Sequence, residues 1–208
     1  PIDIHSDFSV QVLTFLALVL LMIFSGSSYL LLMKENADKM INLLASLDVM
    51  TGLSNRHSFF INAGQVFELG KESKTPVAVL FCDIDDFKKT NDTYGHLFGD
   101  YVLIALAGVL KQSLRQKDLS CRYGGEEFVV LLANADHEDT KKVCDRIMAK
   151  IAELHFSEHP DFRFTVSIGV VNKIPSEGDS LTQFIDLADQ ALYIAKRSGK
   201  NKTEFYQN

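Results

Sequence analysis

The sequence has little cysteine. Its 208 residues include three, and they show no CxxC pair and no Cys/His spacing typical of a zinc site. Cys82, Cys121 and Cys144 are far apart and odd in number, so a disulfide framework is not indicated. We therefore expect reduced, mostly buried thiols in a cytosolic domain.

Basic residues are in the minority, with 21 Lys and Arg against 27 Asp and Glu and a net charge of −6. Non-specific duplex binding requires a basic face, so we expect neither DNA nor RNA as a partner. A nucleotide ligand stays compatible, because metal ions and a few lysines can balance its phosphates. The sequence has no internal repeat, and its 47% of apolar residues predict a buried core. Its length suits one domain and an appendage.

The N-terminal part predicts a membrane span. The first residue is Pro rather than Met, so we expect residues 1–7 to be the remnant of a longer N-terminal region. Residues 8–33 carry no charge, and as a helix they would extend roughly 39 Å, more than the ~30 Å hydrocarbon core of a bilayer. A signal peptide would begin with basic residues, whereas Asp3 and Asp7 lie here, and a buried core helix is rarely so long. We therefore expect residues 8–33 to form a transmembrane helix.

Residues 34–47 continue the helical pattern. Lys34 and Lys39 follow the span, and the positive-inside tendency places the C-terminal part of the chain in the cytoplasm. Apolar residues recur at alternating intervals of three and four, as in the seam of a coiled coil: Leu30, Met33, Ala37, Met40, Leu44 and Leu47. We expect a short coiled-coil stalk that pairs two chains in parallel. The alternative is one amphipathic helix that packs on its own domain.

A globular domain is predicted from Asp48 to the end, residues 48–208. It opens with a Thr-Gly turn signal, after which Ser54 or Asn55 could cap a helix. The expected elements are helices at 56–69, 100–114, 137–154 and 181–197, strands at 77–82, 162–171 and 204–206, and a hairpin around 122–132. This order predicts an α/β (α+β) fold, in which helices cover a mixed, mostly antiparallel sheet.

Two acidic segments are candidates for a metal site. Asp83-Ile84-Asp85-Asp86 ends a buried strand, and Arg122-Tyr123-Gly124-Gly125-Glu126-Glu127-Phe128 forms the hairpin, whose glycines we expect to supply a positive φ. If the two are neighbours in the sheet, Asp83 faces Glu126 and Glu127, and the carboxylates suit Mg²⁺ or Mn²⁺. The alternatives are acids that cap the next helix and a solvated acidic turn.

Three lysines could complete such a site. Lys88 lies one turn past the strand-end acids, and Lys196 and Lys200 are four residues apart near the end of the last helix. An ammonium group can hold a phosphate, so the three together indicate a phosphate-binding set. Taken singly, each lysine is more often a solvated surface group.

Four sequence blocks occur in a fixed order. They read Asp48-x-x-Thr51-Gly52-Leu53-x-Asn55-Arg56, Asp83-Ile84-Asp85-x-Phe87-Lys88-x-x-Asn91-Asp92-x-x-Gly95-His96-x-x-Gly99-Asp100, Gly124-Gly125-Glu126-Glu127-Phe128 and Ala188-Asp189-x-Ala191-Leu192-Tyr193-x-Ala195-Lys196-x-x-Gly199-Lys200-Asn201. Together they closely resemble the GGDEF family of diguanylate cyclases over residues 48–208. The hairpin is a GGEEF variant that keeps both carboxylates, so activity is expected.

The resemblance implies a palm-like GGDEF domain that condenses two GTP into cyclic di-GMP and two pyrophosphates across a homodimer. It implies two Mg²⁺ (or Mn²⁺) ions in each active site. The matching metal ligands are Asp83, the carbonyl of Ile84, Glu126 and Glu127. Glu126 and Lys88 match the catalytic positions.

The resemblance also implies the nucleotide contacts. Asn91 and Asp100 match the residues that read guanine, whose N1–H and N2–H₂ donors lie side by side and suit a carboxylate. His96 matches a position near the nucleotide, although a structural histidine at a helix start is an alternative. The positions that match phosphate contacts are Lys88, Lys196 and Lys200.

Regulation and location follow from the same resemblance. Arg115-x-x-Asp118 ends four residues before Arg122 and matches the family's product-inhibition site for cyclic di-GMP, with Arg146 as its second part. A member anchored through residues 8–33 would lie in the bacterial inner (cytoplasmic) membrane with its catalytic domain in the cytoplasm. The alternative function is a catalytically silent domain that senses GTP or cyclic di-GMP, or serves as the dimerisation module of a membrane receptor. Loss of the hairpin acids usually marks such domains, and both acids are retained here.

Overall fold

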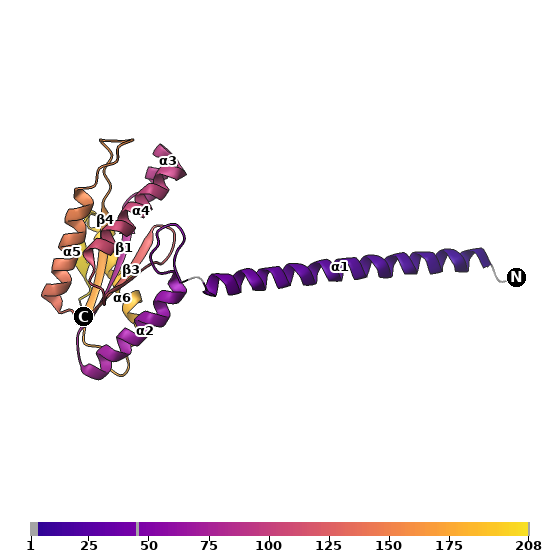
Figure 1. Ribbon diagram of the computed structural model, residues 1–208, viewed down its shortest axis with the longest axis horizontal. Coiled ribbons are helices and arrows are strands. Elements are labelled where there is room, and N and C mark those ends of the chain that lie inside the picture. The colour runs from indigo at the N-terminus through magenta and orange to yellow at the C-terminus, as the bar shows by residue number, and fades with distance from the viewer. Residues whose placement is uncertain (1–3, 45, 208) are drawn as a thin grey trace. The chain divides into compact units, whose positions relative to one another are not determined.

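The computed structural model describes residues 4–44 and 46–207, and within the N-terminal helix it describes side chains at 10–35 and 38. The chain divides into two units (Figure 1). The first is the N-terminal helix, and the second is a compact unit that begins at Ser46.

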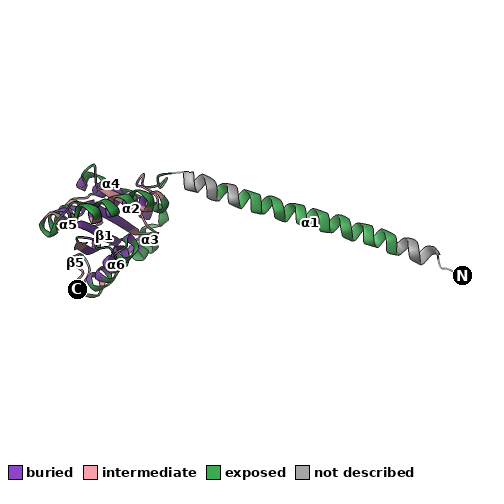
Figure 2. Cartoon of the chain, turned by 90° about the horizontal axis from the view of Figure 1, so that it is seen from below, coloured by how far each residue is buried: buried purple, intermediate pink, exposed green. Residues whose placement is uncertain are grey.

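The N-terminal helix, α1, covers Ile4–Leu44. Its stretch Val10–Glu35 is long and apolar enough to cross a membrane, by length and composition alone, and its side chains are exposed (Figure 2). The predicted span, residues 8–33, overlaps this stretch except at its ends.

The predicted stalk, residues 34–47, is helical to the end of α1 at Leu44. Leu47 lies beyond the helix and forms an antiparallel bridge with Ser54, so the expectation that it extends the helical seam is wrong. Three other seam positions have side chains outside the described residues: Ala37, Met40 and Leu44. The pairing of two chains along this segment stays a prediction.

In the described part of the compact unit, five strands form one sheet in the order β2-β3-β1-β4-β5. Figure 1 labels β1, β3 and β4 of this sheet. The strands are β1 (Val77–Ile84), β2 (Leu119–Arg122), β3 (Glu127–Ala133), β4 (Val166–Lys173) and β5 (Thr203–Phe205). The central strand β1 is antiparallel to both β3 and β4, whereas β4 and β5 are parallel. This mixed, mostly antiparallel sheet confirms the predicted fold class.

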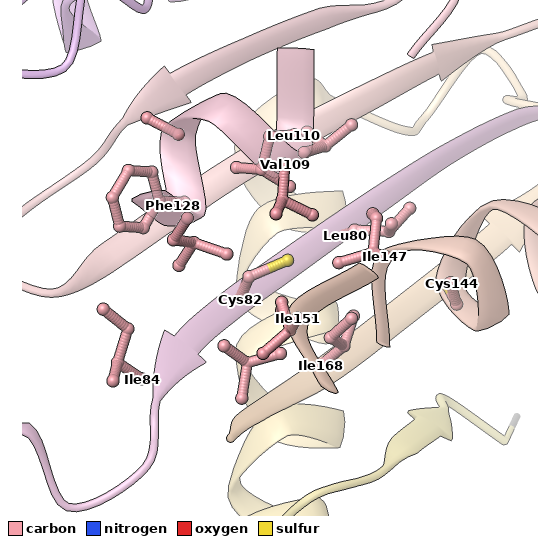
Figure 3. Close-up of a cluster of buried hydrophobic side chains, with 14 of the residues drawn as sticks. Leu80, Cys82, Ile84, Val109, Leu110, Phe128, Cys144, Ile147, Ile151 and Ile168 are labelled. Carbon is pink, nitrogen blue, oxygen red and sulfur yellow. The ribbon is translucent and has the colours of Figure 1, made fainter. Parts of the chain in front are cut away.

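Helices cover both faces of the sheet. They are α2 (Arg56–Ser73), α3 (Phe87–Tyr94), α4 (His96–Ser113), α5 (His137–Ala152) and α6 (Leu181–Arg197). Successive side chains of a strand point to opposite faces, so Leu80 and Cys82 pack toward α4 and α5 (Figure 3). Val79 and Phe81 pack toward α2 and α6. Because β1 is buried on both faces, its packing fixes the backbone that carries the acids at its end.

The segment after β1 differs from the prediction. The sequence indicates a polar connection and a helix from about residue 100, whereas the structure has two helices, α3 and α4. They are separated at Gly95, whose φ is +85°. Helix α3 buries only Phe87 and Thr90, and with 8 residues it is too short for its one-sided burial to give a periodic pattern.

The start of β4 also differs. The alternating apolar residues predict a strand over 162–171, but β4 begins at Val166. Phe162 and Phe164 are buried before the strand begins, and the ring of Phe162 packs edge-on against Phe98 at 4.8 Å between centroids. Packing among aromatic rings produces the same alternation as a strand, so periodicity could not separate the two.

Two smaller expectations are met. The side chain of Asn55 accepts a hydrogen bond from the backbone N–H of Ser58 at 2.8 Å and caps α2, which decides between the two cap candidates. Cys82, Cys121 and Cys144 are free and buried. Burial raises the pKa of the Cys121 and Cys144 thiols to about 12.

A glycine in β4 permits the close approach of α6. A methyl group added at Gly169 would meet the backbone of Ala188 and Leu192. Gly169→Ala should therefore lower the free energy of unfolding by about 1–3 kcal/mol, because helix backbone cannot yield as a flexible side chain does. Urea unfolding followed by tyrosine fluorescence measures this change.

Gly108→Ala on α4 is the matched control, since nothing lies within 4 Å of the added carbon there. It should leave the free energy of unfolding unchanged or raise it by up to about 1 kcal/mol. An equal loss of stability in both variants would contradict the packing argument.

Candidate active site

Strands β1 and β3 bring the two acidic segments together. Their register places Asp83 directly opposite Glu127, as the sequence predicts. Asp83 is buried, with 5% of its surface exposed, while Glu126 and Glu127 are half-buried. Side chains directly opposite in antiparallel strands have Cβ atoms about 4.5–5.5 Å apart. The site therefore concentrates carboxylates at the end of the central strand.

The hairpin turn is built differently from the expectation. Positive φ values among the glycines of the described chain occur at Gly52, Gly95 and Gly199, so the prediction for the hairpin glycines is wrong. The glycine at position 124 provides space instead, because a Cβ there would lie 2.7 Å from a carboxylate oxygen of Glu127. A larger residue would push that carboxylate aside.

Arg122 braces the turn, and the sequence reasoning gave it no function. Its Nε and one terminal nitrogen donate hydrogen bonds to the carbonyl of Gly125 at 3.0 and 2.8 Å. Its other terminal nitrogen lies 3.7 Å from a carboxylate oxygen of Asp48. The turn is thereby held to the first loop of the domain. An arginine two residues before a pair of glycines was the available signal.

Asp83 and Lys196 form an ion pair, with 2.7 Å between Oδ2 and Nζ. Burial and the neighbouring charges of Glu126 and Glu127 nevertheless outweigh this lysine and raise the pKa of the Asp83 carboxyl to about 6. The lysine that the sequence assigns to phosphate thus forms an ion pair with an acid of the site.

Asp85 and Asp86 have other partners. The buried Asp85 carboxylate accepts hydrogen bonds from the Thr165 and Ser167 hydroxyls at 2.6 and 2.7 Å and from the Asn201 N–H at 3.0 Å. Asp86 lies at the N-cap of α3 but makes no capping hydrogen bond with its side chain. The alternative that these acids cap the next helix is therefore wrong for Asp86.

Four of the predicted nucleotide contacts lie on α3 and α4. Lys88 is exposed in the first turn of α3, His96 is the exposed first residue of α4, and Asp100 is half-buried one turn later. Asn91 packs its Oδ1 against Gly99, and this buried oxygen has no hydrogen-bond partner within the described chain. An unpaired buried acceptor is costly, which marks it as a ligand-binding candidate.

The predicted product site lies at the C-terminal end of α4. Arg146 on α5 donates two hydrogen bonds to the carbonyl of Ser113, at 3.2 and 2.5 Å. The exposed Arg115 lies 3.7 Å from Asp139 of α5. Asp118 accepts from the Arg115 N–H at 2.9 Å and so also closes a turn. The structure therefore brings the three predicted residues to one region.

The candidate site has carboxylate oxygens as its possible metal ligands. Among the described residues, no three His, Cys, Asp or Glu side chains are assembled at metal-binding spacing. The charges of Glu126 and Glu127 nevertheless contribute to the raised pKa of Asp83, so the three carboxylates interact. Oxygen ligands of this kind suit a hard cation such as Mg²⁺ or Mn²⁺.

A cleft of about 430 Å³ lies between α3 and residues 161–165. It is lined by Asp85 and Asp86, but none of the residues predicted to bind metal or nucleotide lines it. The residues of the candidate site therefore lie outside this cleft.

Residues 45–202 match the family described as "Diguanylate cyclase, GGDEF domain". The chain belongs to this family. It is similar to the protein named "Probable diguanylate cyclase DgcT" of Escherichia coli strain K12, with 38% identity over 165 residues. The match covers 76% of this chain and 35% of that protein, so the chain spans about a third of its relative's length.

Two solved structures are similar in fold. The GGDEF domain of DgcB from Caulobacter crescentus, in complex with c-di-GMP, matches with a TM-score of 0.73 and 29% identity, over 79% of this chain and 97% of that one. The active GGEEF domain of a diguanylate cyclase from Vibrio cholerae matches with a TM-score of 0.69 and 32% identity, over 75% of this chain and 99% of that one. Its hairpin motif is the one found here.

The raised pKa of Asp83 predicts a pH dependence of stability. Between pH 3.8, the ordinary pKa of an aspartate, and pH about 6, the Asp83 carboxyl is protonated in the folded chain and ionised in the unfolded chain. The folded chain therefore binds more protons than the unfolded chain in that window. The contribution is full below pH ~4 and is lost as the pH rises through ~6, a loss on the order of 2 kcal/mol. Asp83→Asn should remove this slope in urea unfolding measured across the window.

Glu158→Gln, which removes an exposed carboxylate elsewhere, should keep the slope. The opposite result would be a wild-type stability that rises between pH 4 and 6, with Asp83→Asn abolishing the rise. That result would refute the raised pKa of Asp83.

Proposed function

We propose that this chain is a diguanylate cyclase that condenses two GTP into cyclic di-GMP and two pyrophosphates across a homodimer. One observation carries the proposal: the register of β1 and β3 sets Asp83 opposite Glu127, the residue after Glu126, at the end of the central strand. Family membership and the likeness to an active GGEEF domain support it.

The proposed reaction gives each residue of the site a role. Each 3′-hydroxyl attacks the α-phosphate of the other GTP, the α–β bond breaks, and pyrophosphate leaves. Glu126 accepts the proton of the attacking hydroxyl, and Lys88 balances charge on the phosphates. Two Mg²⁺ or Mn²⁺ ions, held by Asp83, the Ile84 carbonyl, Glu126 and Glu127, would polarise the reacting oxygens when bound.

Guanine selection is assigned to α3 and α4. The Asn91 Oδ1 is an acceptor without a partner in the described chain, and Asp100 on α4 is half-buried beside Gly99. Guanine presents two adjacent donors that suit such acceptors, and adenine presents no such pair. His96 completes the nucleotide side, and Lys196 and Lys200 bind the phosphate tail.

Two domains are needed because each binds one GTP and two bonds must form. Catalysis is then mainly the positioning of two half-sites. Residues 34–47 would pair the chains, and the apolar helix would anchor them in the bacterial inner membrane with the catalytic domains in the cytoplasm. Bound cyclic di-GMP would inhibit at Arg115, Asp118 and Arg146, because arginine forks bind phosphate and guanine edges.

The 208-residue chain in detergent micelles, supplied with GTP and Mg²⁺, should form one cyclic di-GMP for every two pyrophosphates, and ATP should not be consumed. Glu126→Gln removes the proton acceptor and a metal ligand, so its rate should fall at least about 100-fold. Product chromatography and a pyrophosphate assay measure both. Absence of cyclic di-GMP at protein concentrations that favour dimers would refute the proposal.

Product inhibition has its own test. Arg115→Ala should weaken the inhibition by added cyclic di-GMP at least about tenfold, because it removes a charged hydrogen-bond donor worth about 1.5–3 kcal/mol. Lys117→Ala, which removes an exposed cation two residues away, should keep the inhibition. Equal inhibition of the wild type and Arg115→Ala would refute the site.

A further inference from the structure

The two lysines assigned to the phosphate tail each form an ion pair with an acid, one near the end of β1 and one just after it. Lys196 Nζ lies 2.7 Å from Asp83, and Lys200 Nζ lies 2.6 Å from Asp86. The second pair joins residues 114 positions apart in the sequence. Neither ammonium group can therefore bind another anion without breaking an ion pair.

The Asp86–Lys200 pair is not needed to hold the two segments together. Asp85, next to Asp86, accepts the backbone N–H of Asn201, next to Lys200, and its carboxylate is also bound by the hydroxyls of Thr165 and Ser167. That carboxylate is buried, whereas the Asp86 and Lys200 side chains are 60% and 40% exposed. The buried hydrogen bonds fix the position of the segment, and the exposed ion pair is the contact that can open.

The backbone presents the two side chains to each other. Asp86, Lys200 and Asn201 have φ values of 55°, 59° and 48°, in the left-handed region that residues other than glycine seldom adopt. Asp86 also lacks the helix-capping bond that an aspartate at this position usually makes. Its carboxylate is thus directed at Lys200 instead of at the start of α3.

We propose that the Asp86 carboxylate competes with the phosphate tail of the nucleotide for the ammonium group of Lys200. Asp86 binds this ammonium group until the phosphate tail displaces it. This inference rests on the proposed function. Asp86 is a positioning residue, since it acts through Lys200 and contacts no reacting atom. Because exposed ion pairs contribute little, the exchange changes nucleotide affinity only modestly, by about two- to fivefold.

The test measures binding and not turnover. Isothermal titration calorimetry of the 208-residue chain in micelles with Mg²⁺ uses the α,β-methylene analogue of GTP, in which the bond that would break is not cleavable. Asp86→Asn should bind the analogue about two- to fivefold more tightly than the wild type. Asparagine keeps the shape and tolerates the left-handed backbone. Guanosine, which has no phosphate, should bind both chains equally.

A double-mutant cycle isolates the competition. In a Lys200→Gln background, Asp86→Asn should no longer tighten binding, because no ammonium group is left to release. Asp161→Asn removes an exposed carboxylate of the same cleft and should give a smaller change. Equal affinities of wild type and Asp86→Asn, or an equal gain in the Lys200→Gln background, would overturn the inference. A wild type that does not bind the analogue would overturn the proposed function itself.

Discussion

Seven backbone pairs hold β3 beside β1, from Val77 opposite Ala133 to Asp83 opposite Glu127. Because the side-chain period of a strand is two, a slip of one residue would turn every side chain of β3 to the other face. Both faces are packed, with Phe128 and Val130 on one side and Val129 and Leu131 on the other. The position of the acids is therefore set by the packing of apolar core residues.

Charge balance is the second constraint on this site. A buried carboxylate beside two others is unfavourable in its ionised form, and the raised pKa of Asp83 shows that one lysine does not compensate for it. A divalent cation carries twice the charge of an ammonium group and accepts several oxygen ligands at once. Lys196 supplies one positive charge to this group of acids through its ion pair with Asp83, and Lys200 pairs with the neighbouring Asp86.

The sequence predicts the parts of the fold that leave a periodic or compositional signal. The continuous apolar run at 77–82 and the helical spacing at 181–197 match β1 and α6 because burial imposes those patterns. The neighbourhood of Asp83 and Glu127 follows from strand pairing. The partner of Lys200 has no such signal, since it depends on left-handed backbone at two distant positions. The pairing of two stalks involves a second copy of the chain, so it is not a property of the fold of one chain.

The buried cysteines should react only slowly with thiol reagents. A thiol whose pKa is about 12, as for Cys121 and Cys144, has almost no thiolate at neutral pH, and the thiolate is the reactive form. Cys82 is also fully buried. A cysteine introduced on the surface of the domain would therefore react selectively with a spin or fluorescent label. Distances between two copies of the chain could then be measured while every native cysteine stays in place.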